Sequence, residues 1–159
     1  MKILIVGIPG TGKTTIGNYL SSERGFIHID MESGDNIPEA WGNPDSFVAK
    51  LEAMPGDVVV TWGFVPNGRF IGMVNQLKDK EFKLIWFDGN REFSRNMFVE
   101  RNKQNGDEFL KKSLDDLRVQ MKRINESDVI NKINPKIIDT FNANGSFRSL
   151  EDVVKDILD

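Results

Sequence analysis

The feature that most constrains this chain is an eight-residue segment of the form G-x-x-x-x-G-K-T, Gly7-Ile8-Pro9-Gly10-Thr11-Gly12-Lys13-Thr14. It follows the apolar run Ile3-Leu4-Ile5-Val6 and leads into a stretch that is compatible with a helix. Glycine adopts backbone conformations that other residues avoid, so this segment is able to curl around an anion with its amide N–H groups pointing inward. The sequence therefore predicts a strand, a phosphate-binding loop and a helix in direct succession.

The same loop predicts a ligand and the residues that hold it. The helix that begins there adds unpaired N–H groups and the positive end of its dipole. We expect Lys13 to contact the β and γ phosphates in a catalytic role and the Thr14 hydroxyl to ligate magnesium. Binding of ATP or GTP with Mg²⁺ follows, and the predicted nucleotide contacts of the loop are Gly7, Pro9, Gly10, Thr11, Gly12, Lys13, Thr14 and Thr15. The fate of the γ phosphate does not follow from the loop.

Apolar and β-branched runs alternate with helical patterns along the whole chain. Strands are predicted at residues 2–6, 26–30, 57–61, 82–87 and 136–140, and helices at 14–22, 45–54, 70–78, 91–125 and 149–158. This alternation is typical of a parallel sheet with helices on both faces, which binds ligands at the carboxyl ends of its strands. No repeat or linker interrupts the pattern, so we expect one α/β domain over residues 1–159.

The composition agrees with one globular domain and indicates in which compartment we expect the protein. The 159 residues are 39% hydrophobic and 28% charged, with no cysteine, and no apolar run approaches the ~20 residues of a membrane helix. The N-terminus has the pattern of a strand and a loop rather than a leader, so we expect a cytoplasmic monomer or homodimer without a membrane partner. The net charge of −3 argues against nucleic acid as the main ligand. Residues 91–123 carry nine basic and six acidic side chains, which leaves a nucleic-acid acceptor open.

Two carboxylates follow the second predicted strand. Asp30 and Glu32 are two residues apart, so an extended chain places both on one side. We expect Asp30 to position the phosphoryl acceptor or take its proton, to help hold magnesium and, with Glu32, to bind the acceptor. The alternative is that both carboxylates only begin a polar loop. His28, the single histidine, shares this face and is interpreted as a half-buried strand residue.

The third predicted strand ends in Thr61-Trp62-Gly63-Phe64. A motor ATPase or GTPase would place an acidic residue near Thr61 to hold magnesium, so its absence disfavours those classes. Gly63 permits close approach of an acceptor, and Trp62 is a candidate wall of the acceptor pocket, although core packing explains this aromatic residue equally well. Arg69 is a candidate contact for an anionic acceptor.

A long helical segment after the fourth predicted strand has the outline of a mobile lid. Residues 91–123 are interrupted near Asn105-Gly106-Asp107, which gives two helices around a break. Arg95 is predicted to contact the nucleotide, and Arg101 to place its guanidinium on the transferring phosphoryl group in a catalytic role. A solvated helical surface is the alternative for these charges. Asn142, in the polar loop after the last strand, is a candidate for recognising adenine, and the alternative is that this loop is only a turn.

Together these motifs resemble the small P-loop kinases, the group that includes gluconate, shikimate and nucleoside monophosphate kinases. The phosphate-binding loop carries the sharpest likeness. Asp30-Met31-Glu32 is similar to the Asp-x-Asp of shikimate-type kinases, and Arg101-Asn102-Lys103 with Leu114 and Gln120 is loosely similar to the gluconate-kinase lid without its histidine. The resemblance implies a three-layer P-loop NTPase fold with a five-stranded sheet in the order 2-3-1-4-5, ATP with Mg²⁺ as cofactor, and a lid that carries an arginine.

The chain also resembles short bacterial and phage ATP-binding proteins, on the segments Val60-Thr61-Trp62-Gly63-Phe64-Val65-Pro66 and Leu84-Ile85-Trp86-Phe87-Asp88-Gly89. Some phage P-loop kinases phosphorylate modified bases or the 5′ ends of DNA. We therefore expect a kinase that transfers the γ phosphate of ATP to a hydroxyl or phosphate acceptor. A nucleotide-binding module without an acceptor of its own and a nucleotide switch or motor are the alternatives.

Overall fold

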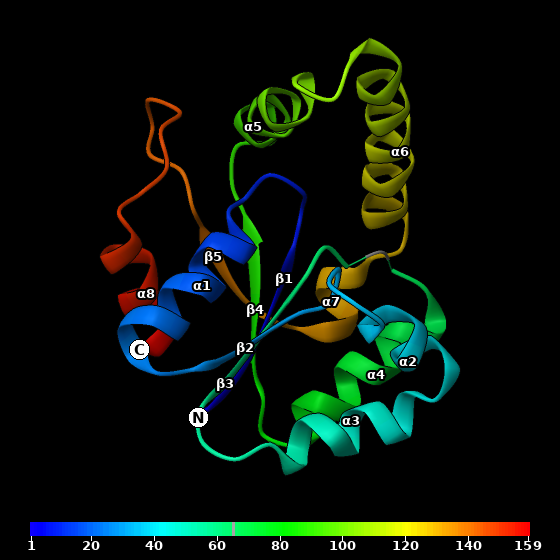
Figure 1. Ribbon diagram of the computed structural model, residues 1–159, viewed down its shortest axis with the longest axis vertical. Helices are drawn as coiled ribbons and strands as arrows, with labels where there is room; N and C mark the ends of the chain where they lie inside the picture. Colours follow the sequence, from blue (N-terminus) through cyan, green and yellow to red (C-terminus); the bar gives the residue numbers. More distant parts are fainter. Residues whose placement is uncertain (65) are drawn as a thin grey trace.

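The computed structural model describes residues 1–64 and 66–159 as a sheet between two layers of helices (Figure 1). Five parallel strands pair in the order β2-β3-β1-β4-β5. Their bounds are Lys2–Gly7 for β1, Ile27–Asp30 for β2, Val58–Trp62 for β3, Lys83–Asp88 for β4 and Lys136–Asp139 for β5. The fold class and the strand order that the family resemblance implies are both confirmed.

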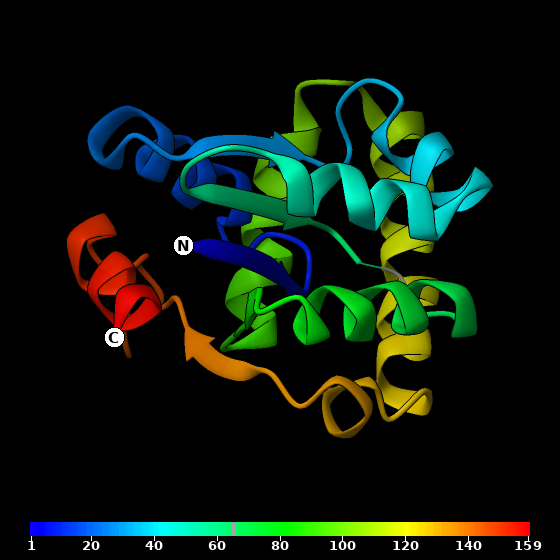
Figure 2. The ribbon, with the colours of Figure 1, turned by 90° about the horizontal axis from the view of Figure 1, so that it is seen from below.

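The described residues also form eight helices, and most of them cover the two faces of the sheet (Figure 2). Their bounds are Lys13–Arg24 for α1, Asn36–Gly42 for α2, Pro44–Ala53 for α3, Gly68–Asp79 for α4, Arg91–Lys103 for α5, Asp107–Glu126 for α6, Val129–Ile133 for α7 and Leu150–Leu158 for α8.

Side-chain alternation along the central strand explains why the core lies on both faces. Ile3 and Ile5 pack with α1 and α8, whereas Leu4 and Val6 pack on the opposite face with α3, α4 and α7. These four side chains are at most 1% exposed. Both faces of β1 are therefore buried, which fixes the position of the loop that follows it.

The helices α5 and α6 lie above the carboxyl ends of the strands rather than in either layer (Figure 1). The chain between them turns at Gly106, whose φ of 92° lies in the left-handed region that favours glycine. The predicted pair of helices around a break is confirmed. Their position places them over the edge at which the strand ends gather.

Two helices were not predicted from the sequence. The segment of α2 contains Pro38, but this residue lies in the first turn. Backbone N–H groups there have no partner within the helix, so the N–H that proline lacks is not missed. Helix α7 has only five residues, too few for a periodic apolar pattern. Among the described residues, no helix combines the length and apolar character that a membrane crossing requires.

Candidate active site

A cavity of about 540 Å³ opens where the phosphate-binding loop faces the helices α5 and α6. It collects residues from the loop, from the ends of β2 and β3, and from both helices. The lining residues are Pro9, Gly10, Gly12, Lys13, Thr14, Thr15, Asp30, Glu32, Gly63, Phe98, Arg101 and Gln120. Most of the residues predicted to form a site therefore lie around one space.

The glycines of the loop allow it to curl and to pack closely. Gly10 and Gly12 have φ values of 80° and 82°, which side chains other than hydrogen rarely permit. A Cβ atom on Gly7 would lie 2.1 Å from the Phe87 carbonyl oxygen, and one on Gly10 would lie 2.2 Å from the Ser94 carbonyl oxygen. Gly7 thus permits tight packing of β1 on β4 and does not line the cavity, whereas Gly10 permits tight packing of the loop against α5 and also lines the cavity.

Lys13 is held inside the loop by a hydrogen bond that its Nζ donates to the Ile8 carbonyl oxygen at 2.8 Å. The residue is 8% exposed, and this burial lowers the pKa of Lys13 from 10.5 to about 8. The Glu32 and Asp30 carboxylates act in the opposite direction on this pKa, while Arg101 lowers it further. A buried ammonium without a full counter-charge is suited to bind a phosphate group.

The acidic side of the cavity is formed by Asp30, Glu32 and Gly63. Asp30 Oδ1 accepts a hydrogen bond of 3.0 Å from the Glu32 backbone N–H, and Glu32 Oε1 accepts one from the Gly63 backbone N–H. The Glu32 carboxylate lies within the cavity although the residue as a whole is exposed. Burial raises the pKa of Glu32, and the neighbouring Asp30 raises it further. Two carboxylates therefore meet at the carboxyl edge of the sheet, as their spacing predicts.

The oxygen donors beside the loop fit a magnesium ion. The Thr14 hydroxyl donates to Asp30 Oδ2 at 3.3 Å, so a hydroxyl and a carboxylate oxygen are already neighbours. Mg²⁺ prefers such ligands and commonly completes its shell with water and substrate phosphates. Among the described residues, no group of three or more His, Cys, Asp or Glu side chains is placed to hold a metal ion. The Thr14 hydroxyl and the Asp30 carboxylate are donors that fit a magnesium ion.

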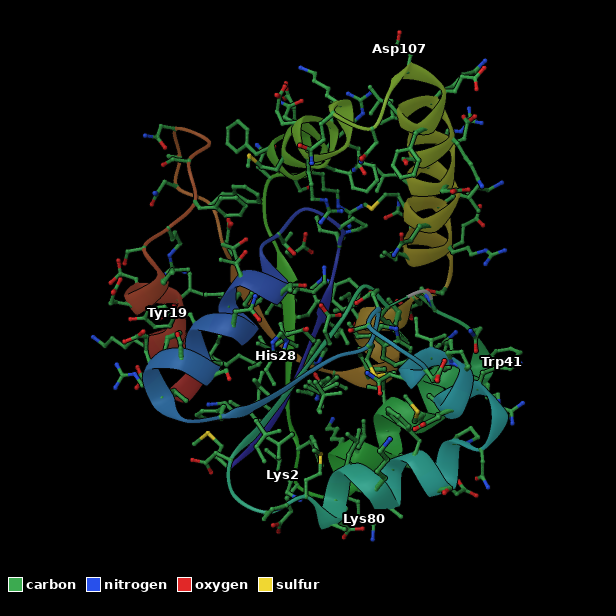
Figure 3. The ribbon with its side chains drawn as sticks, viewed as in Figure 1. Lys2, Tyr19, His28, Trp41, Lys80 and Asp107 are labelled. Atoms are coloured by element: carbon green, nitrogen blue, oxygen red, sulfur yellow. The ribbon has the colours of Figure 1, made fainter. Side chains whose placement is uncertain are left out.

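His28 and Thr61 form a buried polar contact beneath this site rather than part of its surface. His28 Nε2 lies 2.8 Å from Thr61 Oγ1 and its Nδ1 lies 2.9 Å from Asn18 Oδ1, an arrangement in which Nδ1 donates to Asn18 and Thr61 donates to Nε2. Burial lowers the pKa of His28, which favours the neutral ring. Figure 3 shows His28 between α1 and the sheet. The structure agrees with the interpretation of His28 as a half-buried strand residue.

The helices α5 and α6 contribute Phe98, Arg101 and Gln120 to the cavity. The Arg101 guanidinium lies over the Phe98 ring, 5.4 Å from its centroid. Gln120 Nε2 donates to the Gly63 carbonyl oxygen at 3.1 Å and so connects α6 to the end of β3. Phe98 was not predicted from the sequence, because an apolar residue in an amphipathic helix gives no signal that separates a cavity wall from a packing contact.

A second cavity, of about 260 Å³, lies on the other side of the loop against the segment between β5 and α8. The Phe147 ring, 40% exposed, faces the loop, since a Cβ atom on Gly12 would lie 3.4 Å from it. This ring also stacks on Phe141 at 4.8 Å. The hydroxyl of Thr140, which lines the same cavity, is buried and has no hydrogen-bond partner among the described residues. Thr11 and Thr15 line this cavity as well.

Asn142 lies in the same segment but does not line this cavity. Its amide Nδ2 donates to Ser146 Oγ at 3.0 Å and to the Phe147 carbonyl oxygen at 3.1 Å. The side chain therefore holds the turn in shape. Phe147, rather than Asn142, is the residue of this segment that lies beside the phosphate-binding loop, and its signal in the sequence is an aromatic residue at the end of a polar loop.

Trp62 and Arg69 lie outside the cavity. Trp62 is 2% exposed and packs edge-on against Phe70, with ring centroids 4.7 Å apart, so it belongs to the core. Arg69 lies over the Trp41 ring at 5.2 Å and donates to the Gly42 carbonyl oxygen at 3.4 Å. Figure 3 shows Trp41 at the outer edge of the molecule. Neither side chain contributes to the described wall of the cavity.

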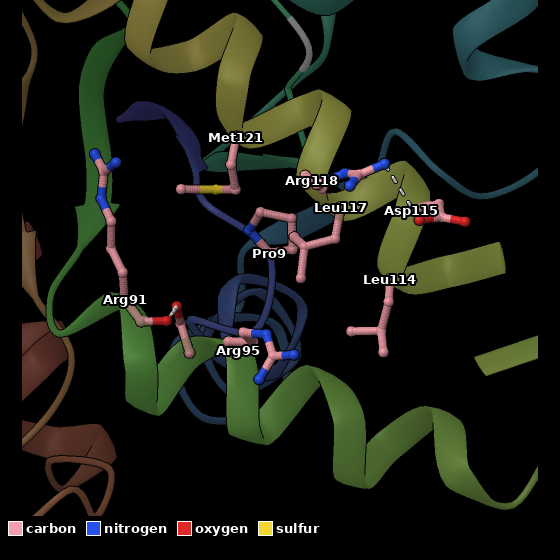
Figure 4. A pocket seen from close by; sticks show the side chains of 9 residues that line it. Pro9, Arg91, Arg95, Leu114, Asp115, Leu117, Arg118 and Met121 are labelled. Carbon is pink, nitrogen blue, oxygen red and sulfur yellow. Dashed lines mark hydrogen bonds and ion pairs between the residues drawn. The ribbon is translucent and has the colours of Figure 1, made fainter. Parts of the chain in front are cut away.

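Arg95 also lies apart from the phosphate-binding cavity. It lines a separate cavity of about 400 Å³ between α5 and α6, together with Pro9, Arg91 and Arg118 (Figure 4). Arg95 and Arg101 are six positions apart, so they point to different sides of α5. The structure brings Arg101 to the loop and leaves Arg95 beside the other lid helix.

Comparisons with solved structures give the same fold. The chain is similar to a gluconokinase from Sinorhizobium meliloti 1021, with a TM-score of 0.64 and 16% identity over 99% of this chain and 89% of that one. A shikimate kinase from Aquifex aeolicus has a TM-score of 0.59 and 21% identity over 99% and 94% of the two chains. A shikimate kinase from Acinetobacter baumannii in complex with shikimate has a TM-score of 0.60 and 16% identity over 99% and 90%.

Sequence comparisons are shorter. A shikimate kinase from Staphylococcus epidermidis is 36% identical over 47 residues, which are 30% of this chain and 28% of that enzyme. One from Staphylococcus aureus is 28% identical over 102 residues, 55% of this chain and 57% of that enzyme. No family model matches. These findings confirm the predicted resemblance: the chain has the fold of the small P-loop kinases, and the proteins that it resembles are phosphotransferases.

Proposed function

We propose that this protein is an ATP-dependent kinase that transfers the γ phosphate of Mg·ATP to a hydroxyl or phosphate acceptor. The observation that carries the proposal is the 540 Å³ cavity, which brings Lys13, Asp30 and Arg101 together around one space beside the phosphate-binding loop. Such a constellation supplies positioning and charge stabilisation, which are the main needs of phosphoryl transfer. We place this activity in the cytoplasm, where ATP and Mg²⁺ are available.

The two cavities suit the two ends of ATP. Backbone N–H groups of the loop and the Lys13 ammonium hold the β and γ phosphates. The smaller cavity takes the base, since it offers the exposed Phe147 ring for stacking and the unpaired Thr140 hydroxyl for a hydrogen bond. Gly12 and Thr15 line both cavities and connect the two ends.

Different residues of the larger cavity have different roles in phosphoryl transfer. The Thr14 hydroxyl and the Asp30 carboxylate hold Mg²⁺, which supplies charge neutralisation between the phosphates. Asp30 and Glu32 accept hydrogen bonds from the acceptor hydroxyl, and Asp30 takes its proton as the oxygen attacks. Arg101 stabilises the charge of the transferring group, and α5, which packs against Gly10 of the loop, helps to exclude water.

Acceptor-dependent release of ADP tests the proposal. The protein is incubated with Mg·ATP and a panel of sugars, nucleosides, nucleotides and modified DNA, and ADP is measured with and without each compound. Release that depends on an acceptor supports a kinase. ATP binding without any such release supports the alternative, a nucleotide-binding module that lacks an acceptor of its own.

Replacement of Asp30 by Asn tests the acceptor side of the cavity. We expect the transfer rate to fall about 100-fold or more, because the proton acceptor is lost. ATP affinity should change little, since Lys13 and the backbone of the loop remain. The matched control is Asp35→Asn, because Asp35 is an exposed carboxylate of the same loop whose side chain caps no helix N–H. A near-normal transfer rate in Asp30→Asn would show that the role given to Asp30 is wrong.

A further inference from the structure

We propose that the acceptor is a hydroxyl compound without negative charge near its reacting hydroxyl, either neutral or cationic. This inference rests on the proposed kinase function and adds the chemical class of its substrate. It is carried by the distribution of charged groups around the 540 Å³ cavity and by the hydrogen bonds that fix its acidic wall.

The cations of the cavity lie on its phosphate side. Among the described lining residues, Lys13 and Arg101 are the two positive side chains. Lys13 belongs to the phosphate-binding loop, and Arg101 lies on the lid helix above it. Bound Mg·ATP places its phosphates against these two groups. Neither cation then remains as a counter-charge for a carboxylate or phosphate of the acceptor.

The ends of β2 and β3 present groups that bind hydroxyl or ammonium groups. Asp30 and Glu32 are hydrogen-bond acceptors there, and both are negative when ionised. Helix α6 contributes the amide of Gln120, which donates to the Gly63 carbonyl oxygen. A site for an acid would require an arginine or lysine at such a position, because a buried anion without a partner is costly.

Arg69 is the arginine that the sequence suggested for an anionic acceptor, and its contacts point elsewhere. Its guanidinium lies over Trp41 and donates to the Gly42 carbonyl oxygen. It does not line the cavity. With Mg²⁺ shared between Asp30 and the phosphates, an acidic acceptor in the cavity would therefore still meet Glu32 and the γ phosphate of ATP with no opposing charge from Arg69.

The size of the repulsion decides how strong the preference is. Two unit charges about 6 Å apart repel each other enough, even at an effective dielectric constant of about 20, to change a binding constant by about 100-fold. Salt and solvent reduce this value. We expect a discrimination of about tenfold or more against an acid relative to a neutral compound of the same shape.

A charge series of three related compounds tests the inference. D-Gluconate, D-glucitol and D-glucamine share a six-carbon polyhydroxy chain and differ at one end, which is negative, neutral and positive in turn. Their affinities are measured by titration calorimetry on the protein loaded with Mg·ADP, and acceptor-dependent ADP release is measured with Mg·ATP. We expect D-glucitol and D-glucamine to bind about tenfold or more tightly than D-gluconate.

Two variants make the test specific to the cavity. Gln120→Arg places a cation beside Gly63, and we expect it to raise the affinity for D-gluconate and to lower that for D-glucamine, each about tenfold. Arg69→Gln is the control and should leave the order of the three affinities unchanged. Both variants are checked for normal stabilisation by Mg·ADP.

Several outcomes would overturn the inference. It is wrong if D-gluconate binds as tightly as D-glucitol, if Arg69→Gln removes D-gluconate binding, or if Gln120→Arg leaves the order unaltered. The inference is also contradicted if none of the three compounds binds to a protein that still binds Mg·ADP. Asp30, Glu32 and Gln120 would then fail to bind any polyol. Loss of Mg·ADP binding by the unmodified protein would instead contradict the proposed kinase function.

Discussion

The phosphate-binding loop and the lid differ in how firmly the rest of the molecule holds them. The loop follows β1, in which five of six residues are buried, and it packs against β4 through Gly7. The lid consists of α5 and α6, with thirteen and twenty residues, yet its buried side chains are only Ser94, Asn102, Leu117 and Ile124. Apolar burial supplies most of the stability of a helix in a protein, so displacing α5 and α6 should cost less free energy than displacing the loop.

This difference separates two functions. In the proposed function, the loop would bind phosphate in a fixed geometry, and the lid would carry the Arg101 guanidinium to it. Changes in the loop should therefore act on nucleotide binding, whereas changes in the lid should act on transfer. The following predictions test that separation, from the largest expected effect to the smallest.

Replacement of Lys13 by Met should nearly abolish nucleotide binding. The variant loses charge-assisted hydrogen bonds to two phosphates, so we expect the affinity for Mg·ATP to fall about 100-fold or more. The free energy of unfolding of the ligand-free protein should rise by about 1–3 kcal/mol at pH 7, because a buried cation with a lowered pKa is removed. Titration calorimetry and thermal unfolding measure the two effects.

The control for Lys13→Met is Lys112→Met, since Lys112 is exposed on α6. It should change neither quantity by more than experimental error. Stabilisation of Lys13→Met by ATP to the extent seen in the unmodified protein would refute the assigned phosphate site.

Replacement of Arg101 by Ala should separate transfer from binding. Loss of one group that stabilises transition-state charge costs about 100-fold in rate. The affinity for Mg·ATP should stay within about threefold, because the loop is unchanged. Arg118→Ala is the control, since Arg118 is an exposed lid arginine that pairs with Asp115 at 3.5 Å. Equal losses of rate and affinity in Arg101→Ala would contradict the division of labour between lid and loop.

Replacement of Gly17 by Ala should show how firmly α1, the helix that follows the loop, is packed against the sheet. A Cβ atom there would lie 2.3 Å from His28 Nε2 and would displace the ring from Thr61, leaving a buried hydroxyl without its partner. We expect a loss of about 2–4 kcal/mol in the free energy of unfolding. Chemical denaturation measures this change.

The matched control is Gly72→Ala on α4, where a Cβ atom would have no neighbour within 4 Å. It should stabilise the protein by about 0.5–1 kcal/mol, because alanine favours the helix. Similar effects of the two substitutions would show that the contact between His28 and Thr61 contributes little to stability.

The pH dependence of nucleotide binding should follow Lys13. Its pKa of about 8 in the free protein means that the ammonium loses its proton above that value, so the affinity for Mg·ATP should fall about tenfold between pH 7 and pH 9. Stability changes in the opposite direction. Because the folded-state pKa lies below the ordinary 10.5, the penalty for burying this cation is present below pH 8 and is relieved between pH 8 and 10.5.

Comparison of the unmodified protein with Lys13→Met isolates this group. The variant should lack the loss of affinity above pH 8 and the gain in stability that accompanies it. A parallel pH profile in both proteins would assign the effect to another group.

The sequence predicts the framework well because the framework rests on local patterns. The order of elements and the five strands follow from apolar runs, and the loop follows from its glycines, Lys13 and Thr14. Asp30 and Glu32 both line the cavity, Asp30 from the end of β2 and Glu32 from the turn after it, so the expected neighbourhood was right although Glu32 lies beyond the strand. The break at Gly106 follows from the same kind of local signal.

The parts that the sequence did not predict depend on tertiary packing. Trp62 and Gly63 are neighbours at the end of β3, yet the first is buried in the core and the second lines the cavity. Arg69 lies in the first turn of α4, after β3, and its guanidinium lies over the Trp41 ring instead of lining the cavity. Sequence position gives the edge of the sheet that a residue approaches, whereas its neighbours decide where the side chain points.

The hydrogen bond from Gln120 to the Gly63 carbonyl oxygen gives α6 a contact with the acceptor wall. The far end of the same helix meets the turn that leads to Arg101 on α5. In the proposed kinase, a substrate that contacted the Gly63 peptide would therefore be one hydrogen bond away from the helix pair that carries the Arg101 guanidinium. Acceptor binding and the position of that guanidinium would then be linked through the same contact.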